Sequence, residues 1–382
     1  MNNFMDIVSR ETSILTDKKN LEHLFTFKDF PVFMGCTDQS LSKDIKFDMS
    51  FSICKNTGII QLDKLLPLNI IYQGQHNDGI GKIWQEHYAN FASFCKQYFP
   101  QSVLEIGGAT DYIGHSFLES HPDSEWTIIE PHPQFIVDKN IKIIKGWFDE
   151  SFKNAKRYDM IVHSHVFEHI YNPRAFICQI GKNVHVGGLH IFSLPNMHEQ
   201  LARKYTNCLN FEHTCFLAEP FVDELLKIQG FKILKKEYFK DHSIFYATKK
   251  IKEVNETQTP NVNNYYNEYK KLYLDFIRYH KNLVSNLNEH LSDFHGDIFL
   301  FGAHVFSQYL LAFGLNENRI KAILDNSPTK QGKRLYGTGL TVQSPEILKN
   351  HHEIGVILKV GIYRDEIIKQ ISQINPKVKI FE

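Results

Sequence analysis

The sequence predicts an α/β protein in which a doubly wound, mostly parallel sheet precedes a second, smaller βαβ domain. Three observations support this fold class. Strand-like and helix-like runs alternate through residues 86–250, as they do in a parallel sheet with helical crossovers. The apolar run Val103–Ile106 leads directly into the glycine turn Gly107–Gly108, and the next apolar run ends in Glu130. A similar strand–glycine–helix pattern returns near the end of the chain.

Residues 1–85 are predicted to form a small N-terminal module of short, irregular segments. Two turn signals mark this region, Lys55-Asn56-Thr57-Gly58 and Asn77-Asp78-Gly79.

The main sheet is expected within residues 86–250. Its candidate strands are Ser102–Ile106, Glu125–Ile129, Ile141–Lys145, Met160–His163, Gly188–Leu194 and Phe231–Tyr238. Helical patterns fall between them. The last of these strands is expected to form an antiparallel hairpin with Ser243–Thr248.

Residues 251–295 are predicted to form a polar linker and then one long amphipathic helix. Apolar side chains recur there at helical spacing, at Tyr269, Leu272, Phe276, Leu283, Leu287 and Leu291. We expect this stripe to pack against a domain of the same chain.

Residues 296–382 are predicted to form the second βαβ domain. Its expected strands are Ile298–Phe301, Ile320–Leu324 and Gly355–Lys359, its helices Val305–Phe313 and Tyr363–Ile374, and it ends near Lys377–Phe381.

Composition excludes several classes of protein. The 43 basic and 43 acidic residues balance to a net charge of zero, which argues against binding to nucleic acid or to an acidic membrane surface. No apolar run is long enough to cross a membrane, and no basic-then-apolar leader opens the chain. The six cysteines form no disulfide framework. We therefore expect a cytoplasmic protein with reduced thiols.

The first glycine turn is typical of a nucleoside-binding domain. Gly107 and Gly108 would let the backbone approach a ligand, and Glu130 at the next strand's tip would accept hydrogen bonds from a ribose diol. Glu105 belongs to the same motif. A purely structural left-handed turn stays open as the alternative, because Ala109 and Asp111 occupy positions where a full motif has glycines.

Several polar residues follow predicted strands and are candidates for chemistry. His165 follows the strand Met160–His163, and Asn196 follows Gly188–Leu194. The pair Glu212-His213 could act as an acid–base unit, because a carboxylate tunes a neighbouring imidazole, and His242 lies in a later turn. For His165 the alternative is a helix N-cap region with surface polar residues, and for Glu212-His213 and His242 it is a structural role in their loops. No metal site is predicted, because no ligands recur at metal-binding spacing.

Together these residues resemble those of class I S-adenosylmethionine-dependent methyltransferases. The matching segments are Glu105-Ile-Gly-Gly, Glu130, Phe167-Glu168-His169, and Gly187-Gly-Leu with Pro195-Asn196. More specifically, the chain is similar to three-domain enzymes that C-methylate nucleotide-linked deoxysugars. That resemblance rests on Tyr72-Gln-Gly with Trp84 and His87, on Phe211-Glu212-His213, on Phe301-Gly-Ala-His304, and on Asp325-Asn-Ser-Pro328 with Lys330 and Gly332. It implies a Rossmann-like methyltransferase domain and a C-terminal Rossmann-like domain.

Two departures from the family pattern matter. The family's N-terminal module binds zinc through two cysteine pairs, whereas here only Cys54 remains and Thr57 replaces its partner. We therefore expect a degenerate module without zinc. The family's tyrosine before Glu-His is replaced at Asn210, which makes methylation at a sugar oxygen as reasonable as methylation at carbon.

The resemblance also implies roles for individual residues. S-adenosyl-L-methionine is the expected cofactor. Its expected binding residues are Tyr72, Glu105, Gly107, Gly108, Glu130, Trp147 or Phe148, and His165. The expected catalytic residues are His213 as general base, Glu212 as its partner, and His242 as the second candidate base. Asn196, Asn210 and His304 are expected to bind the substrate.

The function expected from these roles is methyl transfer to a sugar or nucleotide-linked sugar, in the synthesis of a bacterial surface polysaccharide. The partner would be a small-molecule nucleotide sugar or glycan precursor. A dinucleotide-binding oxidoreductase is the first alternative, because both domains carry Rossmann-type turns, and a non-catalytic scaffold is the second.

Overall fold

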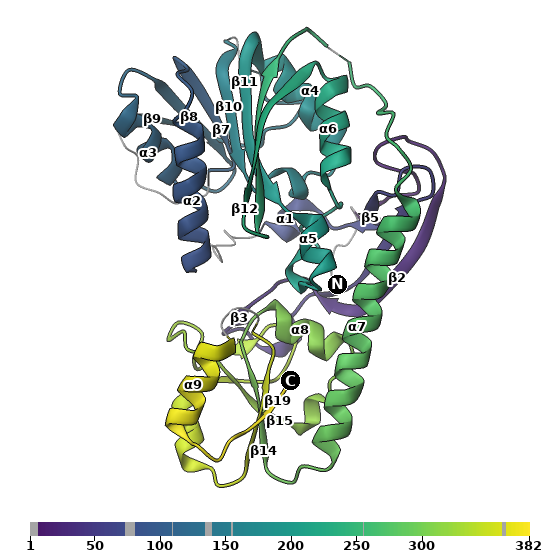
Figure 1. Cartoon of the computed structure of the whole chain (residues 1–382), viewed down its shortest axis with the longest axis vertical. Helices are drawn as coiled ribbons and strands as arrows, with labels where there is room; N and C mark the ends of the chain where they lie inside the picture. Colours follow the sequence, from purple (N-terminus) through teal and green to yellow (C-terminus); the bar gives the residue numbers. More distant parts are fainter. Residues whose placement is uncertain are drawn as a thin grey trace. The chain divides into compact units, whose positions relative to one another are not determined.

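The computed structural model describes residues 7–72, 81–108, 110–133, 140–153, 156–254, 256–360 and 364–382 (Figure 1). The chain divides into two compact units. The first consists of residues 1–23, 51–203 and 211–270, and the second of residues 24–50, 204–210 and 271–382. These limits differ from the predicted boundaries at 85, 250 and 295. Among the described residues, no helix has the length and apolarity needed to cross a membrane.

The first unit is built on one large sheet. Within the described residues it has seven strands, in the order β12-β13-β11-β10-β7-β8-β9. Their bounds are Ser102–Ile106 (β7), Glu125–Glu130 (β8), Ile141–Lys145 (β9), Tyr158–Ser164 (β10), Val184–Pro195 (β11), Phe231–Phe239 (β12) and Ser243–Lys250 (β13). Neighbours from β9 to β11 are parallel, whereas β13 pairs antiparallel with both β11 and β12. The predicted strands and hairpin are confirmed.

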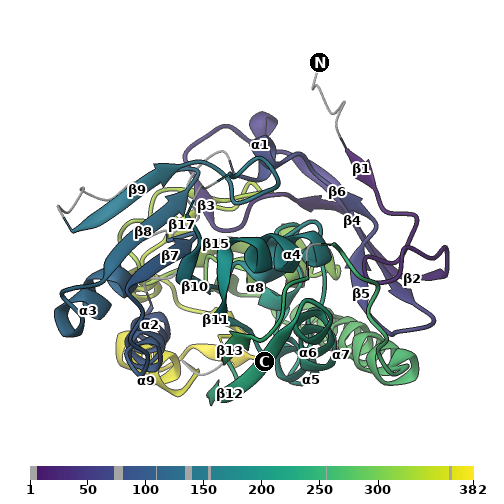
Figure 2. The same cartoon turned by 90° about the horizontal axis from the view of Figure 1, so that it is seen from above.

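Helices cover both faces of this sheet (Figure 2). Helices α2 (Lys82–Cys95) and α3 (Tyr112–Ser120) lie on one face, and α4 (Pro173–Asn183) and α6 (Glu219–Ile228) lie on the other. Large aromatic side chains fill the first face, including Phe94, Phe117 and Trp126. Shorter helical segments follow strands or connect helices: α1 (Leu68–Ile71), η2 (Phe167–His169), α5 (Met197–Ala202) and η3 (Thr206–Cys208).

The prediction of an irregular N-terminal region was wrong. Strands β2 (Leu21–Pro31), β4 (Lys46–Cys54) and β5 (Ile60–Leu62) form a three-stranded sheet in that order. Shorter strands are β1 (Val8–Ser9), β3 (Cys36–Thr37) and β6 (Lys64–Leu65), and η1 (Leu41–Lys43) is a single turn. The predicted turn at Lys55–Gly58 joins β4 to β5. The second predicted turn, at Asn77–Gly79, lies outside the described residues.

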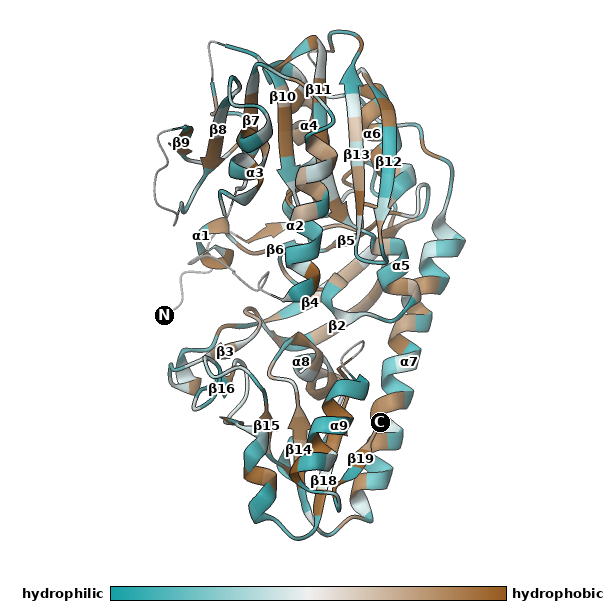
Figure 3. Cartoon of the chain, turned by 60° about the vertical axis from the view of Figure 1, so that its left-hand side comes forward, coloured by the Kyte–Doolittle hydropathy of each residue, from teal (hydrophilic) through white to brown (hydrophobic). Residues whose placement is uncertain are grey.

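The second unit contains a smaller, fully parallel sheet. Its order is β17-β15-β14-β18-β19, with bounds Asp297–Phe301 (β14), Ile320–Leu324 (β15), Val342–Gln343 (β17), Ile354–Leu358 (β18) and Lys379–Phe381 (β19). Helices α8 (Val305–Ala312) and α9 (Arg364–Ile374) follow β14 and β18, and the remaining elements are η4 (Glu317–Arg319), β16 (Arg334–Leu335) and η5 (Pro345–Asn350). Apolar residues concentrate on strands of both sheets, for example β14 and, in the first unit, β8 (Figure 3). The predicted βαβ domain is confirmed.

The predicted long helix is α7 (Tyr266–Ser292). Its residues as far as Lys270 belong to the first unit, and the rest belong to the second. Val284, Leu287 and Leu291 are buried in the core of the second unit. The apolar stripe therefore packs against a domain of the same chain, as expected.

Candidate active site

The carboxyl ends of the parallel strands in the first unit form the edge on which the predicted cofactor residues lie. From β7 at the centre, the chain winds to β8 and β9 on one side and to β10 and β11 on the other. Ligands of open α/β sheets bind beyond the strand ends at such a reversal. Gly107 follows β7, Glu130 ends β8, and His165 follows β10. The structure thus brings three predicted cofactor residues to one edge.

The glycine turn after β7 has a structural reason of its own. Gly107 adopts φ +69°, and a Cβ added there would lie 2.7 Å from Cγ2 of Val166. A Cβ on Gly108 would lie 2.8 Å from Cγ2 of Ile128. Both glycines are therefore required by close packing inside the domain, whether or not a ligand lies above them.

Glu105 is held beneath this turn. Its side chain is buried and accepts a hydrogen bond from the indole Nε1–H of Trp126 at 2.8 Å. Burial raises the pKa of Glu105 to about 8. The carboxyl of Glu105 is therefore hydrogen-bonded to Trp126 within the sheet. The sequence predicted that it binds the cofactor.

Glu130, Tyr72 and Trp147 provide a carboxylate and two aromatic rings, the kinds of side chain that bind a nucleoside. Glu130 is 7% exposed, and its Oε1 accepts the backbone N–H of His132 at 2.9 Å. Trp147 follows β9 and is 39% exposed, with its ring edge-on to Tyr72 at 5.5 Å between centroids. A carboxylate at a strand tip fits a ribose diol, and the exposed ring of Trp147 next to the half-buried ring of Tyr72 fits an adenine. Residues 73–80, which continue the tyrosine–glycine segment, lie outside the described residues.

The structure distinguishes the two aromatic candidates after β9. Phe148 is buried and packs against Phe152 and Phe176, with centroids 5.2 and 5.8 Å away. Trp147 remains exposed. Phe148 is therefore a core residue, and Trp147 is the ring available to a ligand.

Three histidines surround one serine hydroxyl, and we call His87, His165, His242 and Ser243 the serine-centred cluster. Oγ of Ser243 lies 3.1 Å from Nδ1 of His87, 2.8 Å from Nε2 of His165 and 2.5 Å from Nδ1 of His242. The other ring nitrogen of His87 shares a hydrogen bond with Ser164 at 3.0 Å. The sequence had assigned His165 to the cofactor and His242 to catalysis, and had used His87 only in the resemblance.

The imidazoles of this cluster are neutral near pH 7. Burial lowers the pKa of His242 to about 4, and it holds the pKa values of His87 and His165 well below their usual range, with the neighbouring imidazoles adding to the effect. His165 also adopts φ +52°, a strained conformation for a residue other than glycine. Strain of this kind at a strand end is common at functional sites.

A second group, which we call the carboxylate–imidazole cluster, consists of Glu168, His169, Glu212 and His213. Nε2 of His169 lies 3.9 Å from Oε1 of Glu168, and its Nδ1 lies 3.6 Å from Oε2 of Glu212. The rings of His169 and His213 are 5.1 Å apart between centroids. The predicted pair Glu212-His213 therefore meets the η2 turn, whose Glu168 and His169 the sequence analysis had not assigned to catalysis.

Contacts between the two clusters and Tyr72 place all of them at one edge. Nδ1 of His165 lies 3.1 Å from Oε1 of Glu168. Tyr72 is edge-on to His169 at 6.5 Å between centroids. Burial raises the pKa of Tyr72 well above its usual value, and the nearby carboxylates of Glu212, Glu168 and Glu130 add to the rise. The candidate cofactor and catalytic residues of the first unit are therefore neighbours.

The loop that carries Glu212 and His213 is held from two sides. The backbone N–H of Thr214 donates to the carbonyl of Glu168 at 3.0 Å, and Leu62 in β5 donates to the carbonyl of Thr214 at 3.0 Å. The guanidinium of Arg10 also donates to the Thr214 carbonyl, at 2.6 Å. Strand β5 and Arg10 therefore position the loop that carries the candidate catalytic pair.

The predicted substrate residues are dispersed. Asn196 caps α5, because its side-chain oxygen accepts the N–H of Glu199 at 3.3 Å. Asn210 and His304 belong to the second unit. There Asn210 donates to the carbonyl of Asn207 at 3.3 Å, and His304 precedes α8. The structure thus gives Asn196 a capping role that the sequence analysis had not weighed.

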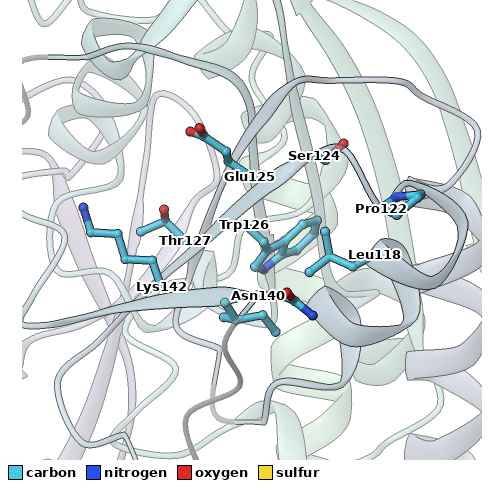
Figure 4. A pocket seen from close by; sticks show the side chains of 9 residues that line it. Leu118, Pro122, Ser124, Glu125, Trp126, Thr127, Asn140 and Lys142 are labelled. Carbon is cyan, nitrogen blue, oxygen red and sulfur yellow. The ribbon is translucent and has the colours of Figure 1, made fainter.

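A cavity of about 600 Å³ lies at the opposite edge of the large sheet, among the residues that begin β8 and β9 (Figure 4). Glu125, Trp126 and Lys142 are among its lining side chains. It is formed by the amino ends of these strands, away from Glu130. We therefore place the candidate site at the carboxyl edge, where the titratable groups gather.

Two family models match this chain. Residues 83–236 match the model of a methyltransferase domain, and residues 237–380 match that of a C-methyltransferase C-terminal domain. No curated protein matches the chain.

Similar solved structures include the N-methyltransferase NodS from Bradyrhizobium japonicum WM9. Its sequence is 15% identical to this chain, and the TM-score is 0.33. The match covers 45% of this chain and 99% of that one. An O-methyltransferase family protein from Burkholderia thailandensis is 10% identical with a TM-score of 0.37, over 44% of this chain and 56% of that one. The two family matches, which together span residues 83–380, carry the assignment. They identify the protein as a class I, S-adenosylmethionine-dependent methyltransferase that resembles the C-methyltransferase family.

Proposed function

We propose that this methyltransferase acts on a sugar or nucleotide-linked sugar, at an oxygen or a carbon, in the synthesis of a bacterial surface polysaccharide. One observation supports the proposal most strongly. The carboxylate–imidazole cluster lies at the sheet edge that carries the candidate cofactor residues. A sugar hydroxyl or an acidic sugar C–H must lose a proton, and this cluster offers groups that accept one.

Different residues of the first unit would bind the cofactor and remove the acceptor's proton. Gly107, Glu130, Tyr72 and Trp147 would hold the nucleoside part of S-adenosylmethionine. When bound, that cofactor supplies an electrophilic methyl group on a sulfonium. The protein's main task is then to hold the acceptor in line with that group, because orientation contributes much of the rate.

Removing the acceptor's proton is assigned to His213, with Glu212 beside it in sequence. A positioned base contributes roughly 10²–10⁴-fold to such a step. In His242, the second candidate, Nδ1 is already hydrogen-bonded to the Ser243 hydroxyl of the serine-centred cluster. The geometry therefore favours His213. Asn210 and His304 stay predicted acceptor-binding residues of the second unit.

The first experiment is calorimetric titration of the full chain with S-adenosylhomocysteine, with NAD as the control ligand. We expect binding of S-adenosylhomocysteine alone. Binding of NAD alone would instead support the alternative of a dinucleotide-binding oxidoreductase.

The acceptor is then sought by incubating the chain with labelled S-adenosylmethionine and a panel of nucleotide sugars. Label transfer to at least one sugar is expected. Peptides and small aromatic compounds are tested in parallel, and transfer only to these would reject the sugar assignment.

A further inference from the structure

We propose that Glu168, His169 and His213 form a binding site for one divalent transition-metal ion of the zinc type. The site itself follows from the structure of the first unit. Only the role suggested for the ion rests on the proposed function.

The geometry of the three side chains suits such an ion. Each offers one ligand atom, and the three atoms all lie within 4.8 Å of one another. Imidazole nitrogen and carboxylate oxygen are ordinary zinc ligands, and two histidines with one glutamate are a known catalytic set that keeps a fourth position open. A contraction of the three side chains toward a common centre would complete the coordination.

Glu168 supplies a second, independent observation. Its side chain is fully buried, and among the described residues neither of its oxygens accepts a hydrogen bond. A buried carboxylate without hydrogen bonds is costly, and a bound cation compensates for it. The nearest imidazole nitrogen is Nδ1 of His165, at 3.1 Å from Oε1 of Glu168.

His169 has the orientation expected of a metal ligand. Its Nδ1 faces the carboxylate of Glu212 at 3.6 Å, while its Nε2 faces Glu168 at 3.9 Å. In metal sites a carboxylate commonly receives the second ring N–H of a ligating histidine and so fixes the ring. Glu212 would have that role here.

The backbone holds the ligands in place before any ion binds. Glu168 and His169 lie on η2, and His213 precedes Thr214, whose N–H donates to the Glu168 carbonyl at 3.0 Å. Two loops far apart in sequence are thereby joined next to the ligand atoms. A site built in this way loses little conformational freedom on binding.

The ion would act on the acceptor of the proposed reaction. A Lewis acid at this edge lowers the pKa of a hydroxyl that it contacts. The acceptor O–H bond would then break with transfer of its proton to the Glu212 carboxylate. In the zinc-bound enzyme His213 would thus be a ligand, and Glu212 would replace it as the proton acceptor assigned above for the metal-free site.

The test uses the full chain, stripped of metal with a chelator and titrated with Zn²⁺ by calorimetry. We expect one specific site per chain. Its affinity should fall at least about tenfold in Glu168→Gln and in His213→Ala, since even changes next to metal ligands have effects of this size. The matched control is His198→Ala, because His198 also faces a carboxylate, that of Glu268 at 3.4 Å, but is 42% exposed. It should bind Zn²⁺ like the wild type.

Folding of each variant is checked by circular dichroism and by its affinity for S-adenosylhomocysteine. Equal Zn²⁺ affinity in the wild type, Glu168→Gln and His213→Ala would overturn the proposal. So would a wild-type chain that binds S-adenosylhomocysteine but has no specific Zn²⁺ site, which would leave the proposed function intact. A chain that binds Zn²⁺ through these residues without sugar methylation would support the site and reject only its role.

Discussion

The two clusters at the edge of the large sheet both contain histidines, but the hydrogen bonds of their buried polar groups differ. In the serine-centred cluster, the Ser243 hydroxyl contacts three imidazoles, and those imidazoles are neutral. In the carboxylate–imidazole cluster, Glu168 is buried without a hydrogen bond among the described residues. A hydroxyl can serve several neutral rings through its one proton and two lone pairs. The three rings of the first cluster thus share one hydrogen-bond partner, whereas Glu168 of the second requires a ligand or a proton.

This difference separates structure from chemistry among otherwise comparable histidines. A closed network of neutral groups stabilises the fold and holds its members in place. An uncompensated carboxylate next to imidazoles is typical of a site that binds or reacts. The predictions that follow test this division.

The largest effect is expected from the catalytic loop. His213→Ala should reduce methyl transfer by roughly 10²–10⁴-fold, because it removes a base or a metal ligand at the reacting edge. Affinity for S-adenosylhomocysteine should stay within about twofold. Steady-state rates and calorimetry with the same preparations provide the measurement.

His242→Ala is the matched variant from the serine-centred cluster. Its loss of turnover should be smaller than that of His213→Ala. The reverse order would transfer the role of base to His242 and remove the contrast between the clusters.

Ser243→Ala should destabilise the fold without affecting Zn²⁺. It leaves buried ring nitrogens of three histidines without their common partner, at a cost of about 2–3 kcal/mol in the free energy of unfolding. Urea denaturation measures the loss. An unchanged denaturation midpoint would mean that the hydroxyl does not hold the cluster together.

Glu105 is a buried carboxyl like Glu168, but it accepts a hydrogen bond from the Trp126 indole. Its pKa is raised from 4.5 in the unfolded chain to about 8 in the fold, so the fold favours the protonated form. The resulting stability is fully present below about pH 4.5 and is lost as pH rises through about 8. Between pH 6 and pH 8 the free energy of unfolding should fall by on the order of 2 kcal/mol from this group.

The variant Glu105→Gln keeps an acceptor for the Trp126 indole but does not ionise. Urea denaturation across this pH range should show a weaker loss of stability for the variant than for the wild type. Parallel pH profiles for the two proteins would show that Glu105 does not titrate in this window.

The smallest effect is expected at the cofactor edge. Trp147→Ala should weaken binding of S-adenosylhomocysteine by roughly tenfold, since a ring stacked on a base contributes about 1–3 kcal/mol. Phe99→Ala is the control, because Phe99 is also an exposed aromatic residue, at 80% exposed. Equal affinities of the two variants would exclude Trp147 from the nucleoside site.

Much of the fold could be predicted because the signals are local. Apart from the two-residue strands β16 and β17, the strands from Ser102 onward are predicted within a few residues, since apolar runs bounded by glycine or polar turns show little ambiguity. The same kind of signal was present but overlooked in β4, where Phe47, Met49, Phe51 and Ile53 alternate with polar residues. Asn196 with Glu199 likewise has the spacing of a helix N-cap motif, which predicts its capping role.

The sequence by itself determined the strands, the glycine turn after β7, the acidic tip of β8 and the candidate Glu212-His213 pair, because each depends on neighbours in the chain. Only the tertiary structure decided that Glu168 and His169 meet this pair, and that His87, His165 and His242 share one hydroxyl. It also decided that Phe148 is core and Trp147 exposed. The physical reason is that burial and hydrogen-bond partners arise from segments far apart in sequence, and these determine whether a polar side chain is satisfied or available for chemistry.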